Sequence, residues 1–305
     1  MLAGGVGAAR FLRGLRSLLD PARLTIIVNT ADDETFFGLH VSPDLDTVTY
    51  TLAQRVDPRQ GWGIAGDTFD CLSALQRYYS NAWFRLGDGD LATHIFRTDA
   101  LRRGRSLTRV TATIAARHGV RQRILPMSDQ PVRTHIVVAG RGSLPFQDYL
   151  VKGRGRGRVR RVRFAGIRAA RPAPGVLSAL RRADAIILPP SNPIVSIQPI
   201  LALPGVRDTL RRRRRRTAAV SPLVRGLPIK GPLDRMLRGL GLEVSAVGVA
   251  KLYRDFVDLF VLDQRDAALA PRIAALGMRT LVTDTIMRSP AQSRRLARAV
   301  LRALM

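Results

Sequence analysis

Short apolar runs rich in β-branched residues alternate with segments of helical periodicity along most of the chain. The runs that predict strands are 24–29, 134–138, 185–188, 218–220 and 259–262. The segments that predict helices include 8–19, 46–54, 176–182, 232–240 and 290–304. Strands alternating with helices are typical of βαβ units, and continuous apolar strands fit a sheet covered on both faces. We therefore expect an α/β fold: a Rossmann-like, mostly parallel sheet with helices on both faces.

The whole chain, 1–305, fits a single α/β domain, because this length suits one large domain or one domain with a sizeable insertion. The stretch around 67–119 is mostly helix-like, so we expect a mainly helical insertion there. At the start, only Met1, Leu2 and Ala3 precede a glycine-rich segment typical of the turn between a first strand and a first helix. Either the first strand is unusually short or the native start lies upstream of Met1, and we favour an upstream start.

Charge is the most unusual property of the composition. Lys and Arg number 50 against 23 Asp and Glu, a formal net charge of +27, and residues 211–216 are all arginine. One explanation is an anionic partner, such as nucleic acid, a membrane surface or a phosphorylated ligand. The other, which we favour for the total charge, is an arginine-rich composition spread over solvated faces. The run ends a predicted helix, where positive side chains complement the dipole, and no nucleic-acid-binding motif accompanies it. We expect no nucleic-acid partner.

The remaining composition narrows the class of protein further. Cys71 is the only cysteine, which excludes an internal disulfide and a cysteine-based zinc site. The four histidines show no metal-ligand spacing. No apolar run reaches the roughly 18 residues that a spanning helix needs, and glycines interrupt the apolar N-terminal segment too early for a signal peptide. We expect a cytoplasmic protein without a membrane partner.

The first candidate for chemistry is the glycine-rich loop Gly4-Gly5-Val6-Gly7 with Arg10 on the helix that follows. Glycines let backbone N–H groups approach phosphate oxygens closely, the helix N-terminus adds a favourable dipole, and Arg10 adds a charged fork. The loop matches neither GxxxxGK[ST] nor a full GxGxxG. On these residues alone, a tight turn without a ligand is about as good an explanation.

Carboxylates form the second candidate. The segment from Asn29 to Asp33 follows a predicted strand, at the strand end where open α/β sheets bind ligands. Asp44 and Asp46 then open a helix, where acidic residues also serve as ordinary caps. Two carboxylates two residues apart suit Mg²⁺ together with substrate phosphates. A carboxylate here would also suit proton acceptance from an attacking hydroxyl.

Other polar segments have a similar placement. The segment 86–94 concentrates polar groups around a predicted helix start and ends at His94, for which a structural role is at least as good an explanation as a functional one. Ser191, Asn192 and Pro193 follow the strand predicted at 185–188, and Ser221 follows the next. Polar loops after several strands converge on one edge of the sheet, which indicates a ligand cleft more strongly than any single motif.

Taken in order, these segments resemble the 2-phospho-L-lactate transferase family of the CofD type, which makes the deazaflavin coenzyme F-420. GGxG alone is a weak signal, whereas eleven blocks in the family's order, from Gly4 to Met287, are highly specific. The blocks are GGVGAARFL, VNTADD, SPDLDTVTYTL, GWGIAGDTF, WFRLGDGDLATHIFRT, ILPMSDQPVRT, FQDYLV, PPSNPIVSIQPILALPGVR, AVSPLV, EVSAVGVAKLYRDFVDLFVLD and TDTIM.

The resemblance implies a reaction. A phospho-acid group (phospholactyl, phosphoenolpyruvyl or phosphoglyceryl) moves from a guanylylated diphospho donor to the terminal ribityl hydroxyl of the deazaflavin Fo, and GMP leaves. Mg²⁺ is the family's metal. Phosphoryl transfer requires mainly positioning and charge neutralisation rather than a protein nucleophile, and the chain shows no serine triad or reactive-cysteine motif.

The resemblance also implies roles for individual residues. Asp44 and Asp46 are expected to be catalytic and to bind the metal. Asp46, Arg85 and Asp88 are expected to contact the acceptor. The residues expected to bind the phosphates and nucleotide of the donor are Gly4, Gly5, Gly7, Arg10, Asn29, Ser191, Asn192 and Pro193.

Some properties stay open at this point. The family's LGD block usually continues with arginine, whereas this chain has Gly89, so a contact to acceptor or phosphate is lost or moves to Arg85. No residue of the sequence indicates which phospho-acid is transferred. A homodimer is expected only because homodimers are the commonest oligomers. The gluconeogenesis-factor-like proteins share the fold and the first glycine loop. The alternative function is therefore a nucleotide-sugar-binding regulator without transfer activity, although the blocks SPDLDTVTY and LGDGDLATHIFRT favour the transferase.

Overall fold

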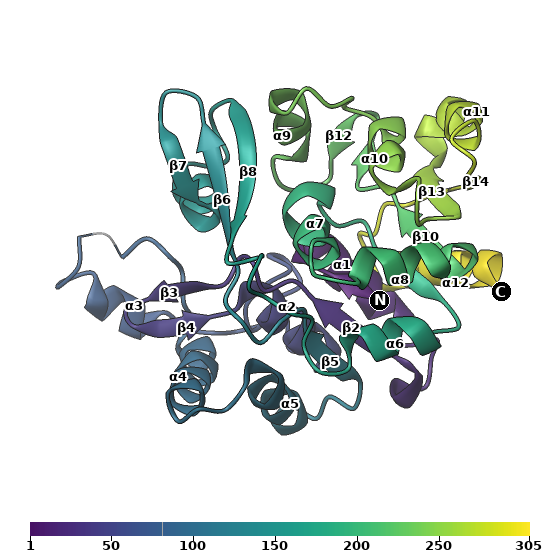
Figure 1. The fold of residues 1–305 in the computed structure, drawn as a ribbon. Helices are drawn as coiled ribbons and strands as arrows, with labels where there is room; N and C mark the ends of the chain where they lie inside the picture. Colours follow the sequence, from purple (N-terminus) through teal and green to yellow (C-terminus); the bar gives the residue numbers. More distant parts are fainter. Residues whose placement is uncertain (81) are drawn as a thin grey trace.

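The computed structural model describes residues 1–80 and 82–305, and its centre is a parallel sheet in two hydrogen-bonded parts (Figure 1). One part has the order β1-β2-β5, formed by β1 (Leu2–Ala3), β2 (Thr25–Val28) and β5 (Arg123–Pro126). The other has the order β14-β13-β10-β9, formed by β9 (Ile186–Leu188), β10 (Thr217–Val220), β13 (Leu259–Asp263) and β14 (Arg279–Thr283). Strands β1 and β9 are in contact, so the spatial order is β5-β2-β1-β9-β10-β13-β14.

The strand order reverses direction between β1 and β9. Strands β2 and β5 are added on one side of β1, whereas the later parallel strands are added on the other side. In an open α/β sheet such a reversal leaves a crevice at the carboxyl ends of the strands, where ligands bind. The Rossmann-like fold expected from the sequence is confirmed, and its crevice lies beside the residues that follow β1 and β9.

Alternate residues of the strands face two separate cores. Ile26 and Val28 belong to one core, whereas Ile27 belongs to the other. The first core contains residues of α1 (Gly5–Leu15), α2 (Pro43–Leu52), α5 (Leu107–Arg117) and α12 (Pro290–Leu304). The second contains residues of α6 (Val176–Arg182), α8 (Val206–Arg212), α9 (Leu233–Gly239), α10 (Ala246–Tyr253) and α11 (Ala270–Ala274). Because side chains alternate along a strand, helices on both faces explain why β9, β10 and β13 are buried at every position.

Strand β1 has two residues in this chain. Its two residues pair with β2 as Leu2↔Ile27 and Ala3↔Val28. Both are fully buried between β2 and β9. This pairing places the glycine loop at the centre of the sheet.

One predicted strand lies outside the parallel sheet. The run 134–138 belongs to β6 (Arg133–Val138), which forms an antiparallel sheet of order β7-β6-β8 with β7 (Gly142–Pro145) and β8 (Val159–Ala165). Buried and half-buried residues alternate along β6, as expected when only one face is covered. Figure 1 shows these three strands as an upright layer beside the main sheet.

The region predicted to form a helical insertion holds α3 (Asp70–Leu75) and α4 (Asp88–Arg102) and continues into α5. Helix α5 packs on β5 and α2, so it belongs to the helical cover of the sheet. Helix α4 contacts the hairpin of β3 (Glu34–Phe36) and β4 (Leu39–Val41). The remaining short elements are β11 (Leu223–Val224), β12 (Leu227–Pro228), α7 (Gln198–Leu201), 3₁₀ helices Pro21–Arg23, Arg214–Arg216 and Gln264–Leu269, and π-helices Asp148–Lys152 and Pro193–Ile197.

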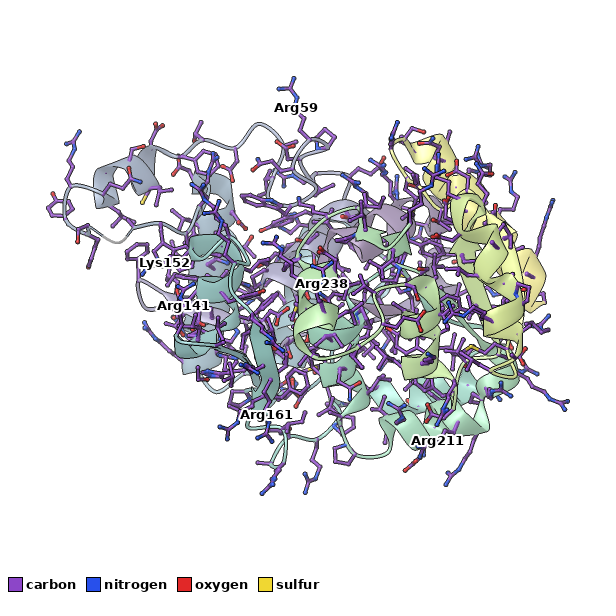
Figure 2. All side chains as sticks on the ribbon, turned by 90° about the horizontal axis from the view of Figure 1, so that it is seen from above. Arg59, Arg141, Lys152, Arg161, Arg211 and Arg238 are labelled. Atoms are coloured by element: carbon purple, nitrogen blue, oxygen red, sulfur yellow. The ribbon has the colours of Figure 1, made fainter. Side chains whose placement is uncertain are left out.

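Basic side chains are spread over the outside of the molecule. In Figure 2, Arg59, Arg161 and Arg211 project from different sides of the molecule. Among the consecutive arginines, Arg211 pairs with Asp255 and Asp208, and Arg214 donates to the carbonyl oxygens of Val257 and Gly277. No helix in the described ranges is both long and apolar enough to span a bilayer.

Candidate active site

A cavity of about 560 Å³ opens at the point where the strand order reverses. Its wall includes the loop after β1, residues 4–7, and the loop after β9, residues 190–192. The first turns of α2 and α4 and the strap of residues 228–233 complete much of the rest. The polar loops that the sequence predicted to converge therefore line one cavity.

The glycine loop is packed tightly against the β9 loop. A Cβ at Gly7 would lie 2.0 Å from the carbonyl oxygen of Pro190, so only glycine allows this approach. Ser191 Oγ donates to the carbonyl oxygen of Gly4 at 2.8 Å, and the Gly5 amide donates to Asp44 Oδ1 at 2.7 Å. With Arg10 also lining the cavity, the N-terminus of α1 forms a wall suited to an anion.

Two buried carboxylates share one amide next to this loop. Asn29 Nδ2 donates to Asp32 Oδ2 and to Asp44 Oδ2, both at 3.0 Å. Asp32 and Asp44 both line the cavity, and in the described part of the chain Asp32 Oδ1 is buried with no hydrogen-bond partner. Burial and then the charge of Asp44 raise the pKa of Asp32, and burial raises the pKa of Asp44 to about 6. Two such carboxylates and an unsatisfied oxygen fit a divalent cation.

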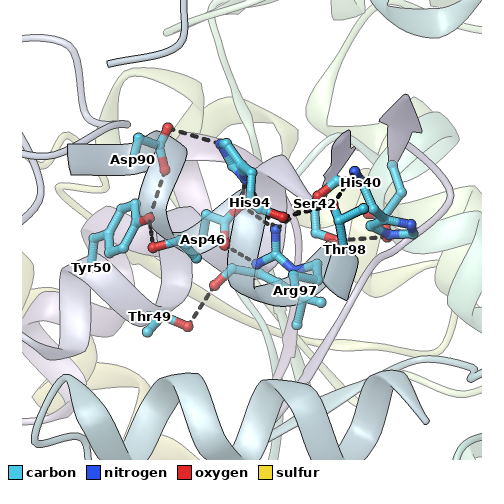
Figure 3. A network of polar contacts seen from close by, with 12 residues as sticks. His40, Ser42, Asp46, Thr49, Tyr50, Asp90, His94, Arg97 and Thr98 are labelled. Carbon is cyan, nitrogen blue, oxygen red and sulfur yellow. Dashed lines mark hydrogen bonds and ion pairs between the residues drawn. The ribbon is translucent and has the colours of Figure 1, made fainter. Parts of the chain in front are cut away.

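Asp46, two residues further along α2, is held by a different partner. Both of its carboxylate oxygens accept hydrogen bonds from the guanidinium of Arg97, which is 1% exposed. The two residues are 51 positions apart, and α4 brings them together (Figure 3). Although burial opposes it, the charge of Asp46 raises the pKa of Arg97, so the guanidinium keeps its charge. Such a bidentate pair fixes the carboxylate in one orientation.

His94 and Asp90 extend this network to the cavity. Arg97 Nη1 lies 3.2 Å from His94 Nδ1, and His94 Nε2 lies 3.3 Å from Asp90 Oδ2. Since arginine only donates, Nδ1 accepts and the proton is on Nε2, facing Asp90. Tyr50 donates its hydroxyl to Asp90 Oδ1 at 2.6 Å, and burial followed by the charge of Asp46 raises the pKa of Tyr50. Asp46, Tyr50, Asp90 and His94 all line the cavity.

The site therefore offers two donor sets for a metal ion. Ligand atoms of Asp46, Asp90 and His94 lie within 4.8 Å of one another, but Asp46 already has a cation in Arg97. Asp32 and Asp44 have no cationic partner within 4.0 Å among the described residues. Because Mg²⁺ prefers carboxylate oxygens to imidazole, Asp32 and Asp44 fit it better.

Of the residues predicted for the acceptor, Arg85 lines the cavity and Asp88 does not. The Arg85 guanidinium lies 4.4 Å from the centre of the Phe69 ring. Asp88 accepts hydrogen bonds from Thr68 Oγ1 and from the amides of Asp70 and Cys71, so it caps α3 while it opens α4. Gly89, in place of the family's arginine, donates its amide to Asp67 Oδ1 at 2.7 Å.

The residues predicted for the donor divide in the same way. Gly4, Gly5, Gly7, Arg10, Ser191 and Asn192 line the cavity. Asn29 lies behind its wall and orients Asp32 and Asp44. Asn192 Oδ1 caps the π-helix by accepting from the amides of Ile194 and Val195, and Pro193 is the buried first residue of that helix, outside the lining.

The sequence reasoning did not select Asp32, Asp90, Arg97 or Lys230 as site residues. A signal was available for α4, where Asp90, His94 and Arg97 have spacings of four and three and so share one helical face. All three are buried. A polar stripe at core spacing is a better indicator of a site than any one of these residues alone. Lys230 and Asp32 carry no such pattern.

Comparisons with known proteins identify the family of this chain. The family model described as 2-phospho-L-lactate transferase CofD matches residues 1–297. The 2-phospho-L-lactate transferase of Methanosarcina mazei is 40% identical over 303 residues, covering 99% of each chain. The phosphoenolpyruvate transferase of Thermobifida fusca is 44% identical over 280 residues, covering 88% of this chain and 86% of the relative.

Solved structures support the fold alone. A protein from Bacillus halodurans superposes with a TM-score of 0.66 at 18% identity, covering 98% of both chains. Another structure, described as a member of the UPF0052 family from the same organism, superposes with a TM-score of 0.63 at 16% identity and covers 98% of this chain and 96% of that one.

Proposed function

Because the chain belongs to the CofD family of 2-phospho-L-lactate transferases, we propose that it transfers a phospho-acid group from a guanylylated diphospho donor to the deazaflavin Fo. The reaction releases GMP and is a step of coenzyme F-420 biosynthesis. The observation that carries this proposal is the cavity at the reversal point of the sheet, where a glycine loop faces fixed, buried carboxylates.

The donor is proposed to bind along the glycine loop. Arg10 and the N-terminus of α1 supply positive charge for its phosphates. Ser191 and Asn192 lie next to this loop, on the side proposed for the guanosine. Asn29 acts from behind the wall by orienting the carboxylates of Asp32 and Asp44.

The acceptor is proposed to bind on the side of α2 and α4. Phe84, next to Arg85 in the chain, lines the cavity and offers apolar surface for a flat ring system. Asp46 and Tyr50, both from α2, also line the cavity. Asp88 orders the segment that presents Arg85 and has no direct contact with the ligand in this proposal.

Mg²⁺ is proposed to bind Asp44 and Asp32. Asp32 Oδ1 has no hydrogen-bond partner among the described residues, and the pKa values of both carboxyl groups are raised, so the site lacks positive charge. When bound, it neutralises charge on the phosphoryl oxygens. Asp46, which the sequence placed with Asp44 as a ligand, is assigned here to the acceptor instead, because the Arg97 guanidinium already supplies the cation beside it.

The bond changes follow from this placement. The terminal ribityl oxygen of Fo attacks the phosphorus attached to the acid, a new P–O bond forms, and the bridging P–O bond to GMP breaks. The hydroxyl proton passes to a carboxylate, for which Asp46 is the proposed acceptor. Its Arg97 partner and the α2–α4 packing hold that carboxylate still, so positioning supplies much of the rate.

The decisive experiment is a one-pot assay with Fo, Mg²⁺ and each of three guanylylated donors, carrying phospholactate, phosphoenolpyruvate or phosphoglycerate. The sequence identity to a 2-phospho-L-lactate transferase, 40%, is close to that to a phosphoenolpyruvate transferase, 44%, so the assay needs both donors. We expect GMP release and a heavier deazaflavin by mass spectrometry, with turnover lost in excess EDTA and restored by Mg²⁺. No product with any donor, combined with calorimetric binding of a nucleotide sugar but not Fo, would establish the regulator alternative instead.

A further inference from the structure

Two cations share one wall of the cavity without a carboxylate beside them. Arg10 from α1 and Lys230 from the strap of residues 228–233 both line it. Lys230 Nζ donates to the carbonyl oxygen of Gln60 at 2.6 Å. Among the residues that the structure describes, neither Arg10 nor Lys230 has a carboxylate within 4.0 Å, although several arginines on the outer surface do. Burial and then the charge of Arg10 lower the pKa of Lys230.

The chain offers a direct contrast in Lys251. Its Nζ lies 2.8 Å from Glu243 Oε2 on the surface of α10, away from the residues that line the cavity. Lys230 differs from Lys251 because its partner, the Gln60 carbonyl, is neutral and a second cation, Arg10, is nearby. The two like charges repel each other. An anion between or beside them removes that repulsion.

Lys230 is exposed, and a hydrogen bond to the Gln60 carbonyl oxygen positions its ammonium. Asp57 accepts hydrogen bonds from the amides of Arg59 and Gln60, which orders the loop that carries the Gln60 carbonyl. This loop rests on the glycine loop, because a Cβ at Gly61 would lie 2.7 Å from Val6 Cγ1. The Gln60 carbonyl therefore directs the Lys230 ammonium toward the wall where α1 begins.

We propose that Lys230 is a donor-binding residue that, together with Arg10, binds an oxyanion of the guanylylated donor. This inference rests on the proposed function and deepens it by assigning the strap of residues 228–233 to the donor. The oxyanion belongs either to the diphosphate or to the carboxylate of the phospho-acid, and GDP, which has only the former, distinguishes the two sources.

The test compares Lys230→Gln and Lys230→Arg with the matched control Lys251→Gln. Steady-state kinetics give the KM for donor and for Fo, and titration calorimetry gives the affinity for GDP at two salt concentrations. We expect Lys230→Gln to raise the donor KM about 10- to 100-fold, the range for one charge-assisted hydrogen bond. The KM for Fo stays within about twofold, and Lys230→Arg recovers most of the loss because it keeps the charge.

The GDP measurement identifies the group. A matching loss of GDP affinity in Lys230→Gln, with a weaker salt dependence than in the wild type, assigns Lys230 to the diphosphate. Wild-type GDP affinity together with a raised donor KM assigns it to the acid carboxylate. Either result supports the inference, and Lys251→Gln behaves as the wild type.

Wild-type donor KM and wild-type GDP affinity in Lys230→Gln overturn the inference. A lower melting temperature with those two values unchanged also overturns it, because the contact with Gln60 would then be only structural. Failure of the proposed function looks different: the wild-type protein itself forms no product from Fo, whereas the effect of Lys230→Gln on GDP binding is still measurable.

Discussion

Asp46 is the residue on which structure and proposed chemistry depend most closely. Its carboxylate is buried and shares both oxygens with Arg97. Removing one partner of a buried pair leaves the other charge uncompensated, which costs about 3–5 kcal/mol of stability. A single Asp46 substitution therefore alters both turnover and stability, and the two effects need separate variants.

We expect Asp46→Asn to lower kcat by about 10²- to 10⁴-fold, the range for loss of a positioned proton acceptor, and to lower the unfolding free energy. The double variant Asp46→Asn with Arg97→Met removes the unpaired charge, so it regains stability while turnover stays low. Urea unfolding and steady-state kinetics measure the two properties, with Asp99→Asn on the exposed face of α4 as control. Recovery of turnover in the double variant would exclude Asp46 from the proton transfer.

At this scale the sequence predicts residue types better than partners. The SPDLD block indicates that Asp44 and Asp46 matter. It does not indicate that Asn29 joins Asp44 to Asp32 or that Arg97 takes both oxygens of Asp46, because those contacts depend on how α2 packs against β2 and α4. Asp88 illustrates the converse: its motif resembles a ligand site, and its carboxylate caps a helix.

Helix α1 makes close contacts at two glycines, one at the site and one with α12. Gly7 lies against the β9 loop, and a Cβ at Gly14 would lie 2.2 Å from the backbone carbonyl of Ser293 in α12. The atoms that a side chain at Gly14 would meet belong to the backbone of Ser293 and Arg294, and Gly14 and Ser293 are both buried. Backbone cannot move aside as a flexible side chain can, so the two helices must separate to accept a side chain. Glycine at this position therefore sets the α1–α12 spacing.

We expect Gly14→Ala to destabilise the protein by about 1–3 kcal/mol or more, the usual cost of overpacking, while the donor KM of the folded enzyme stays near the wild-type value. Urea unfolding provides the measurement. Gly104→Ala is the control, since open space surrounds it and only its positive φ of 79° adds strain, about 1 kcal/mol. Equal losses in both variants would show that the α1–α12 contact is loose.

The hydrophobic pattern predicted helices and strands correctly where these elements are long or strongly apolar. The helix predicted at 290–304 has those bounds, and the strands at 185–188, 218–220 and 259–262 all lie in the parallel sheet. Strand β1 has only two residues, and β14 has half-buried and exposed positions, so neither has the apolar run that predicts a strand. Sheet order is not a local property, and the neighbouring placement of β1 and β9 comes from tertiary packing.

For the whole molecule, the question is whether the net charge of +27 acts as a field or only through a few placed cations. A field would steer an anionic donor toward the protein from any side and would weaken with salt. The structure favours the second possibility, in which a few cations in the cavity bind the donor. Arg10, Arg85 and Lys230 line the cavity. Four of the six consecutive arginines instead pair with acidic residues or donate to backbone carbonyl oxygens elsewhere, namely Arg211, Arg213, Arg214 and Arg216.

The variant Arg212→Gln with Arg215→Gln distinguishes these two roles, because both side chains are exposed. We expect it to elute from a heparin column at lower salt than the wild type, while kcat and the donor KM stay within about twofold, since exposed charges away from a site add little to binding. Arg10→Gln should show the opposite pattern: elution close to wild type and a donor KM raised by about tenfold or more. A comparable rise in donor KM for both variants would mean that the surface charge guides the donor, and that the cavity cations alone do not explain its affinity.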